Sequence, residues 1–300
     1  MSDTPSFPEG SLAKLLNMPF TSYGRMGETA QAETYLHVSD LLKNKKDNRF
    51  CIREAVLRHF ERPYRPKGTV PAKMRLLWDT GNLIGDEIVL RRLIEESLEY
   101  RHLVWGDWQC VNCGHVEVEF GYRPPRGSED TPRGSCSECG CWTFRYKEVD
   151  LREKTVNLVG HPDLLLRLED GTIVIYEIKT INRTDIPWDS INRPLGDHHM
   201  QASYYYYLLK REGYKVSRRI RFLYVDRSLD DMYREKPYKE LVEDVLPVSR
   251  IQPGIDTCRK TQEHITARTL PDRICESCKD TRTNKCTVVS SCFGRRLNTI

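Results

Sequence analysis

The stretch "GHPDLLLRLEDGTIVIYEIKT", residues 160–180, decides how the middle of this chain folds. Two runs of apolar and β-branched residues flank Asp170-Gly171, a dipeptide typical of tight turns, so the pattern predicts a β-hairpin. Asp163, Glu177 and Lys179 interrupt the apolar pattern. A charge inside a strand is costly to bury unless it is paired or binds a metal. The stretch therefore indicates either a surface ion-pair network or a reaction centre.

The spacing of the three charged residues favours a common site. Glu177 and Lys179 are two residues apart and face the same side of a strand, while Asp163 opens the neighbouring strand. Pairing across the hairpin brings both carboxylates within reach of one divalent ion, and their hard oxygen atoms suit Mg²⁺ or Mn²⁺. Lys179 would then orient a water or help to deprotonate it, as metal-assisted phosphodiester hydrolysis requires.

Composition places the chain among globular proteins. It has 300 residues, of which 30% are charged and 39% are apolar, which is typical of a folded chain. There is no uncharged apolar run of about 18 residues, so no membrane helix is expected. The N-terminus lacks the pattern of a secretory signal, so a cytoplasmic location is expected. The formal net charge of +4 permits nucleic-acid binding through a local patch without demanding it.

The order of predicted elements favours an α/β core with additions. We expect an N-terminal arm over 1–45 and a core formed by 46–107 and 147–250, which includes a long helix within 74–102 and a strand-like run at 154–160. An insertion over 108–146 contains five cysteines and several glycines. A cysteine-rich tail over 251–300 is expected to pack on the core. Helix, strands, helix and strand in this order indicate an α/β fold.

The stretch "QASYY" places Gln201 and Tyr205 four residues apart on one face of a predicted helix. Together with the hairpin motifs, this stretch makes the chain resemble the PD-(D/E)XK nuclease superfamily, in particular its RecB-like branch. "GHPD" resembles the Gly-x-x-Asp motif of the branch, "EIK" its acidic-x-Lys motif, and "QASYY" its Gln-x-x-x-Tyr motif; Tyr204 replaces Tyr205 if the register differs by one. The resemblance implies a restriction-endonuclease-like core, in which helices flank a mixed central sheet.

The resemblance also implies roles for these side chains. Asp163 and Glu177 would be metal ligands for Mg²⁺ or Mn²⁺, and Lys179 the catalytic lysine. Gln201 and Tyr205 would contact DNA or brace the site.

An upstream helix of the branch usually supplies one further metal ligand, a His or a Glu shortly after a glycine. In "GNLIGDEIV", Gly85 stands where the His is expected, which departs from the pattern. Asp86 or Glu87 could reach the metal instead. A solvent-facing position on the helix is the other interpretation of Glu87.

Two CxxC pairs predict a metal site in the insertion. They are separated by 22 residues, and each is followed by a glycine, as a tight thiolate-binding turn prefers. The four candidate ligands are Cys110, Cys113, Cys136 and Cys139. Four thiolates at this spacing fit tetrahedral Zn²⁺, which would stabilise a segment too small to bury a core. We therefore expect a zinc ribbon, with Cys141 and His115 outside the ligand set.

The remaining cysteines resemble the split cluster site of CRISPR-adaptation nucleases and related phage exonucleases. That resemblance implies a [4Fe–4S] cluster held by one cysteine before the core and three beyond it, as four thiolates generally hold such a cluster. Five candidates compete for the four places: Cys51, Cys275, Cys278, Cys286 and Cys292. A second zinc in the tail without Cys51 is the alternative, and Cys258 is expected to take no part.

Together the motifs predict a metal-dependent DNA nuclease, acting as an exonuclease on single strands or ends in repair, recombination or phage replication. In a phage-encoded protein the location would be the host cytoplasm. No G-x-x-x-x-G-K-[ST] motif is present, so a helicase or recombination partner would be a separate protein. The alternative from another class is a catalytically silent, nucleic-acid-binding zinc-ribbon protein on a nuclease-like scaffold.

Overall fold

The computed structural model describes residues 36–42, 50–60, 80–81, 83–92, 97, 100–121, 135–182, 185–228, 237–276, 286 and 288–294. These residues form two compact units. Unit 1 combines the described parts of 72–150 and 161–245, and unit 2 those of 23–71, 151–160 and 246–300. The domain limits expected from the sequence, namely 1–45, 46–107 with 147–250, 108–146 and 251–300, stay a prediction. None of the helices in the described residues combines the length and apolar character that crossing a bilayer would take.

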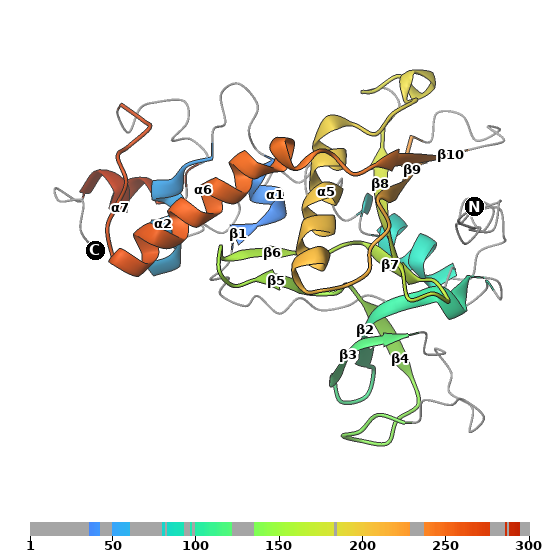
Figure 1. Cartoon of the computed structure of the whole chain (residues 1–300). Coiled ribbons are helices and arrows are strands. Elements are labelled where there is room, and N and C mark those ends of the chain that lie inside the picture. Colours follow the sequence, from blue (N-terminus) through green and yellow to red (C-terminus); the bar gives the residue numbers. More distant parts are fainter. Residues whose placement is uncertain are drawn as a thin grey trace. The chain divides into compact units, whose positions relative to one another are not determined.

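Unit 1 is built on a mixed β-sheet (Figure 1). Its strands are β2 (Val104–Cys110), β3 (Val116–Gly121), β4 (Phe144–Lys147), β7 (Leu164–Arg167), β8 (Ile173–Ile181), β9 (Arg219–Asp226) and β10 (Tyr238–Asp244). The order across the sheet is β10-β9-β8-β7-β2-β3, and β4 pairs with β2. Strands β8 and β9 run parallel, whereas the other neighbouring strands are antiparallel.

Helices cover both faces of this sheet at β8. Helix α5 (Gly196–Arg211) packs against β8 on the side of Glu177, and its His199 ring lies 5.7 Å from that of Phe222, the cross-strand partner of Glu177. On the other face, the π-helix η2 (Leu83–Leu90) shares a hydrophobic core with Tyr176. The short 3₁₀ turns η3 (Arg101–Leu103) and η4 (Trp188–Ser190) also belong to the unit. The predicted α/β fold, a mixed sheet flanked by helices as in restriction-endonuclease-like proteins, is confirmed.

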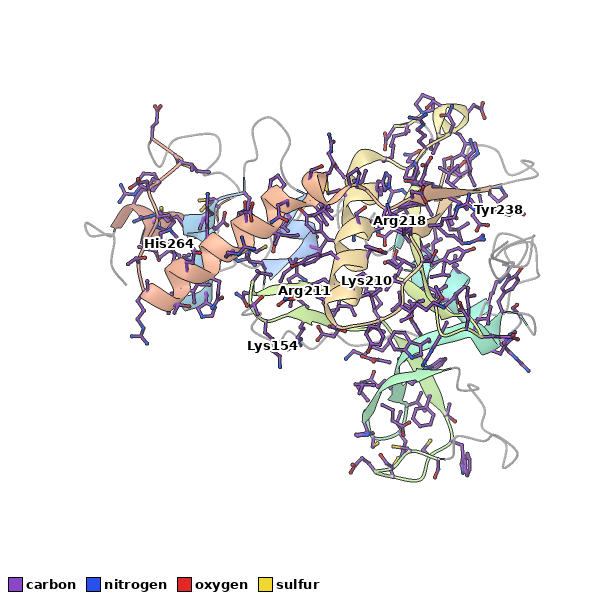
Figure 2. All side chains as sticks on the ribbon, in the orientation of Figure 1. Lys154, Lys210, Arg211, Arg218, Tyr238 and His264 are labelled. Carbon is purple, nitrogen blue, oxygen red and sulfur yellow. The ribbon has the colours of Figure 1, made fainter. Side chains whose placement is uncertain are left out.

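The end of helix α5 is firmly defined. Lys210 and Arg211 occupy its last turn (Figure 2), where positive charge suits the carboxyl end of a helix. Gly213 then adopts φ +92° and donates a hydrogen bond to the carbonyl of Lys210, and its lack of a side chain permits this left-handed turn. The helix therefore ends at Arg211.

Unit 2 joins a small sheet to a helical cluster. The sheet has the order β1-β6-β5 and contains β1 (Leu36–His37), β5 (Leu151–Glu153) and β6 (Leu158–Gly160). The helices are α1 (Val38–Leu41), α2 (Ile52–Phe60), α6 (Val248–Ala267) and α7 (Val289–Gly294). Helix α2 packs against both α6 and α7, and apolar side chains such as Val56, Leu57 and Ile265 form the core between them.

Two local predictions are corrected by the structure. The run 154–160 is not one strand, because residues 154–157 form a turn that ends at Asn157, with φ +55°; Asn tolerates this conformation better than most residues. Within the predicted helix 74–102, the described segment from Leu83 to Leu90 is a π-helix instead of a regular α-helix. Such π segments occur often at functional sites.

Candidate active site

The β7–β8 hairpin brings the two predicted carboxylates together. Leu164 pairs with Tyr176 in an antiparallel register, so Asp163, one residue before β7, lies beside the chain at Glu177 and Ile178. The backbone N–H of Ile178 donates a hydrogen bond to Asp163 Oδ2 at 2.7 Å. This bond fixes the orientation of the Asp163 carboxylate toward the centre of the site.

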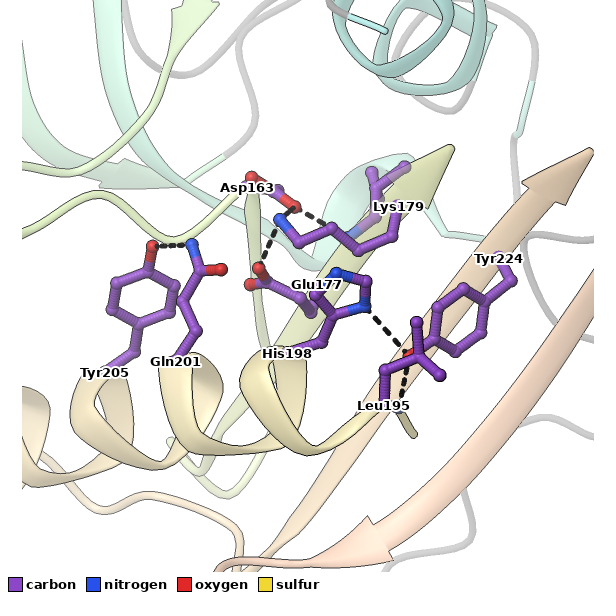
Figure 3. A network of polar contacts seen from close by, with 9 residues as sticks. Asp163, Glu177, Lys179, Leu195, His198, Gln201, Tyr205 and Tyr224 are labelled. Atoms are coloured by element: carbon purple, nitrogen blue, oxygen red, sulfur yellow. Dashed lines mark hydrogen bonds and ion pairs between the residues drawn. The ribbon is translucent and has the colours of Figure 1, made fainter. Parts of the chain in front are cut away.

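Lys179 completes a three-residue cluster with these carboxylates (Figure 3). Its Nζ atom lies 2.5 Å from Glu177 Oε1 and 3.5 Å from Asp163 Oδ2. The Glu177 side chain is wholly buried, whereas those of Lys179 and Asp163 are 22% and 21% exposed. A surface ion-pair network does not bury one of its carboxylates completely, so the geometry favours the reaction-centre interpretation.

Burial and charge shift the proton affinities of this cluster in defined directions. Burial raises the pKa of Glu177 to about 8, the nearby Asp163 charge adds to the increase, and Lys179 opposes it. Burial alone would lower the pKa of Lys179, but the charges of Glu177 and Asp163 outweigh it and raise that pKa. Lys179 is therefore an ammonium group at neutral pH, held between two acidic side chains.

The donor set fits a divalent cation. Both carboxylate oxygens of Glu177 are buried, and within the described part of the chain no group donates a hydrogen bond to Oε2. A buried carboxylate oxygen without a partner is energetically costly. Together with the Asp163 carboxylate it presents hard oxygen ligands of the kind that Mg²⁺ and Mn²⁺ prefer.

Helix α5 contributes the predicted Gln–Tyr pair. Gln201 Nε2 donates a hydrogen bond to the hydroxyl oxygen of Tyr205 at 2.6 Å. Burial, followed by the charges of Glu177 and Asp163, raises the pKa of the Tyr205 hydroxyl, so this phenol lies within electrostatic range of both carboxylates. This bond joins Gln201 to Tyr205, and the roles of Gln201, Tyr205 and the alternative Tyr204 stay a prediction.

The structure adds two residues that the sequence analysis missed, His198 and Tyr224. His198 Nδ1 lies 3.1 Å from the Tyr224 hydroxyl, which also accepts a hydrogen bond from the Leu195 backbone N–H at 2.9 Å. Tyr224 pairs with Lys179 across the parallel strands β8 and β9, and Figure 3 shows the His198 ring on the side of α5 that faces Glu177. Burial raises the pKa of Tyr224 to about 12.

One of these two residues carried a signal in the sequence. His198 precedes Gln201 by three residues, and residues three apart share a helix face. Tyr224 carried none, because nothing local to its strand indicates which strand lies beside it.

The predicted third ligand remains a prediction. Helix η2 packs against β8 on the face of Tyr176, opposite the face that carries Glu177 and Lys179. A side chain at Gly85 would meet nothing within 4 Å. The side chains of Asp86 and Glu87 lie outside the described residues.

The four cysteines of the insertion form a candidate metal centre. Their ligand atoms all lie within 4.8 Å of one another, and two Sγ–Sγ pairs, Cys110 with Cys139 and Cys113 with Cys136, are separated by 3.6 Å. Each CxxC turn closes through a glycine with positive φ, Gly114 at +76° and Gly140 at +71°.

The four thiols differ in proton affinity. Hydrogen bonds led by that from the Cys113 N–H lower the pKa of Cys110 to about 6. The backbone N–H of His115 would lower the pKa of Cys113, but burial and the side chains of the other three cysteines outweigh it and raise that pKa to about 12. The close approach of the four ligand atoms defines the cluster, and Cys141 and His115 are not part of it.

Unit 2 gathers most of the remaining cysteines. Cys51, Cys275, Cys286 and Cys292 line one small cavity, and Arg53 and Arg273 also line it. Burial raises the pKa of Cys51 to about 11 and that of Cys286 to about 11. Cys278 lies outside the described residues. Cys258 on α6 is buried and is not one of the lining residues.

Comparisons with known proteins agree with the motif analysis at the level of the family. A model of the "PD-(D/E)XK nuclease superfamily" matches residues 30–288. Among solved structures, the chain is similar to one described as "Crystal structure of SSO0001", at 13% identity and a TM-score of 0.36, over 87% of this chain and 86% of that chain. A search of curated proteins finds no match. Because the family model covers most of its length, this chain belongs to the PD-(D/E)XK nuclease superfamily.

Proposed function

We propose that this protein is a Mg²⁺- or Mn²⁺-dependent deoxyribonuclease of the RecB-like branch that hydrolyses phosphodiester bonds. The wholly buried Glu177 carboxylate beside Asp163 and Lys179 is the observation that carries this proposal. Family membership implies nuclease activity, a divalent metal and DNA as substrate. When bound, the metal supplies an activated water and offsets charge that develops on the phosphate.

The side chains of the cluster have separate tasks in this proposal. Asp163 and Glu177 hold the metal, and the hydrogen bond from Ile178 N–H keeps Asp163 oriented before it binds. Lys179, as an ammonium group, orients the attacking water and stabilises negative charge on the phosphate. Tyr205 and Gln201 brace the α5 side of the site and contact the DNA.

The finer function we propose is that of an exonuclease acting on single strands or ends, in repair, recombination or phage replication. The combined Asp163, Glu-x-Lys and Gln-x-x-x-Tyr motifs support it through their resemblance to that branch. Any unwinding would come from a separate helicase or recombination protein, and the proposed location is the cytoplasm, that of the host for a phage-encoded protein.

The test is the degradation of end-labelled linear DNA and of circular single-stranded DNA with Mg²⁺ or Mn²⁺. Lys179→Ala and Glu177→Gln should each slow the reaction at least ~100-fold, because each removes charge acting on the transition state. The exposed positions Lys154 and Glu169 provide matched controls, as Lys154→Ala and Glu169→Gln should retain activity. Absence of degradation by the wild type would refute the nuclease, and equal cleavage of circular DNA would refute the exonuclease.

We propose Zn²⁺ as the ion of the Cys110, Cys113, Cys136 and Cys139 site. Four thiolates around one centre are the usual ligand set of structural zinc.

For unit 2 we propose a [4Fe–4S] cluster held by four of the cysteines Cys51, Cys275, Cys278, Cys286 and Cys292. The shared cavity supports this, since it joins Cys51 to cysteines more than 200 residues away in the sequence. Arg53 and Arg273 at the same cavity would offset the negative charge of a thiolate-ligated cluster. Anaerobic purification should give a brown protein, with absorbance lost in Cys51→Ala and retained in Cys258→Ala. A colourless protein that contains zinc alone would refute the iron–sulfur assignment in favour of a second zinc.

A further inference from the structure

The histidine ring at the start of helix α5 faces the candidate active site. His198 lies in the first turn of α5, three residues before Gln201 on the same helix face. Its side chain is half-buried, so a substrate can reach it. Figure 3 shows one ring nitrogen bonded to Tyr224 and the opposite edge of the ring directed toward Glu177 and Lys179.

The sheet places the partner of this ring beside the charged cluster. Tyr224 on β9 is the register partner of Lys179 on β8, and partners on neighbouring strands share a face of the sheet. Burial raises the pKa of Tyr224 to about 12, and the charges of Glu177 and Lys179 also act on it. The hydroxyl that holds His198 therefore lies within electrostatic range of the cluster.

The hydrogen bonds of Tyr224 define which ring nitrogen of His198 carries the hydrogen. The hydroxyl oxygen accepts the Leu195 N–H at 2.9 Å and lies 3.1 Å from His198 Nδ1. With a pKa of about 12 and no exposed surface, the hydroxyl keeps its proton at neutral pH. Among the described residues, Nδ1 is the only acceptor bonded to that hydroxyl.

A hydrogen on Nδ1 would leave the buried hydroxyl proton of Tyr224 without an acceptor, which is costly. Nδ1 of His198 therefore accepts, and the neutral ring carries its hydrogen on Nε2. Protonation of Nδ1 would reverse the bond to Tyr224 and still leave the hydrogen on Nε2. The ring thus offers the site a hydrogen-bond donor in both protonation states.

This donor decides between two uses of the ring. A histidine that binds a metal must offer a lone pair on a ring nitrogen, whereas Nε2 of His198 carries a hydrogen. The ring does not serve to satisfy the buried carboxylate either, because neither oxygen of Glu177 accepts a hydrogen bond from it. A donor next to the Lys179 ammonium group suits an oxygen atom of a negatively charged ligand.

We propose that His198 is a catalytic residue, whose Nε2–H donates a hydrogen bond to a non-bridging oxygen of the scissile phosphate. The inference rests on the proposed function, because it needs a phosphodiester at the carboxylates of Asp163 and Glu177. Lys179 on β8 and His198 on α5 then both contact the phosphate. A donor that is already oriented stabilises the negative charge that develops in the transition state. Tyr224 is a positioning residue that keeps the ring in the donor form.

The position of the hydrogen is measured by NMR of protein labelled with ¹⁵N-histidine, in which His198→Gln identifies the signals. Nε2 should be protonated and Nδ1 should be an acceptor, and Mg²⁺ should leave this unchanged. Loss of the hydrogen from Nε2 on addition of Mg²⁺ would make His198 a metal ligand and overturn the inference. Calorimetric titration should likewise show the same Mn²⁺ affinity in His198→Ala as in the wild type.

Cleavage rates at saturating DNA test the donor itself. His198→Ala should lower the rate about 100-fold, the effect of removing one donor to a developing charge. His198→Gln should restore much of it, because its amide nitrogen reaches about as far as Nε2. His198→Asn should not, because its amide reaches only as far as Nδ1. His102→Ala removes an exposed histidine of unit 1 and should keep the wild-type rate.

A single phosphorothioate at the cleaved bond identifies the contacted oxygen, because sulfur accepts hydrogen bonds weakly. Sulfur at the oxygen contacted by Nε2–H should slow the wild type and have no further effect on His198→Ala. Sulfur at the other non-bridging oxygen should slow both proteins equally. The same penalties for both diastereomers in wild type and His198→Ala would overturn the inference, as would equal rates of His198→Gln and His198→Asn.

One measurement separates this inference from the proposed function. In the Lys179→Ala background with Mg²⁺, a thymidine oligonucleotide should shift the proton resonance of His198 Nε2–H. An unchanged resonance overturns the inference even where the wild type degrades DNA. A shifted resonance in a protein whose wild type hydrolyses no DNA supports the phosphate contact and refutes the nuclease alone.

Discussion

Lys179 Nζ lies 2.5 Å from Oε1 of Glu177, on a strand where the Glu177 carboxylate is wholly buried. The lysine and the glutamate are two residues apart, so the pleat of β8 places both on the face covered by α5. A buried carboxylate that relies on one lysine is poorly compensated, because its second oxygen has no hydrogen-bond donor among the described residues. The negative charge of the ionised Glu177 carboxylate is therefore only partly neutralised at the centre of the candidate site.

The first prediction concerns Glu177→Gln and the free energy of unfolding in metal-free protein. The folded-state pKa of Glu177 is raised from the usual 4.5 to about 8. The contribution of the Glu177 side chain to the free energy of unfolding is therefore fully present below about pH 4.5. It is lost as the pH rises through about 8. Glu177→Gln should be more stable than wild type at pH 9, by roughly 1–3 kcal/mol, and show a smaller difference at pH 5.

Denaturant unfolding in EDTA at the two pH values measures this effect. Glu169→Gln, at an exposed position, should show no difference that depends on pH. A Glu177→Gln protein that is equally destabilised at pH 5 and pH 9 would contradict the prediction.

The second prediction separates metal ligands from the lysine. Lys179→Met removes the ammonium group from between the two carboxylates, and their repulsion should then draw in a divalent cation at least as tightly as in the wild type. Glu177→Gln should instead weaken Mn²⁺ binding at least ~10-fold, because it removes a charged ligand. Calorimetric titration with Mn²⁺ measures both, and loss of Mn²⁺ binding in Lys179→Met would show that the lysine belongs to the binding site.

The third prediction concerns Tyr224→Phe. The change removes the hydroxyl that accepts the Leu195 N–H and contacts His198 Nδ1. Loss of these contacts should lower the free energy of unfolding by about 1 kcal/mol and the DNA cleavage rate by about 10-fold, as the His198 ring loses its orientation. Unfolding curves and initial rates measure the two effects.

Tyr206 is the matched control for that change. It lies on α5 and is half-buried, and Tyr206→Phe should leave both quantities unchanged. If Tyr224→Phe lowers stability but leaves the cleavage rate intact, the His198–Tyr224 contact serves the fold alone.

The fourth prediction concerns the metal of the ribbon. Cys113→Ser removes one of the four clustered thiolates, so bound zinc, measured by elemental analysis, should fall by one ion per chain. Cys141→Ser changes a neighbouring cysteine outside the cluster and should keep that ion. Equal zinc loss in both variants would place Cys141 among the ligands.

The local pattern of the chain was enough to predict the hairpin at the centre of the site. Alternating apolar residues and the Asp170-Gly171 turn define both strands, and Gly171 indeed takes φ +80°. Hairpin pairing is local, so the meeting of Asp163 with Glu177 could be foreseen. The same holds for the CxxC turns, because each brings its two thiolates together within four residues.

The local pattern could not predict contacts between segments that are far apart in the sequence. Tyr224 lies beside Lys179 only because β9 runs parallel to β8, and no property of the sequence near Tyr224 specifies its neighbouring strand. The π-helical geometry of Leu83–Leu90 was also missed, since the apolar spacing there is equally compatible with a regular helix.

The sequence by itself determined which chemical groups are present and how the local elements pair: two carboxylates and a lysine on one hairpin, a Gln–Tyr pair on one helix face and four thiolates in two turns. Only the tertiary structure decided that Glu177 is wholly buried and that His198 and Tyr224 join the site. The physical reason is that burial and proton affinity depend on every element packed around a residue. Spacing along the chain reports only on neighbours within a few residues.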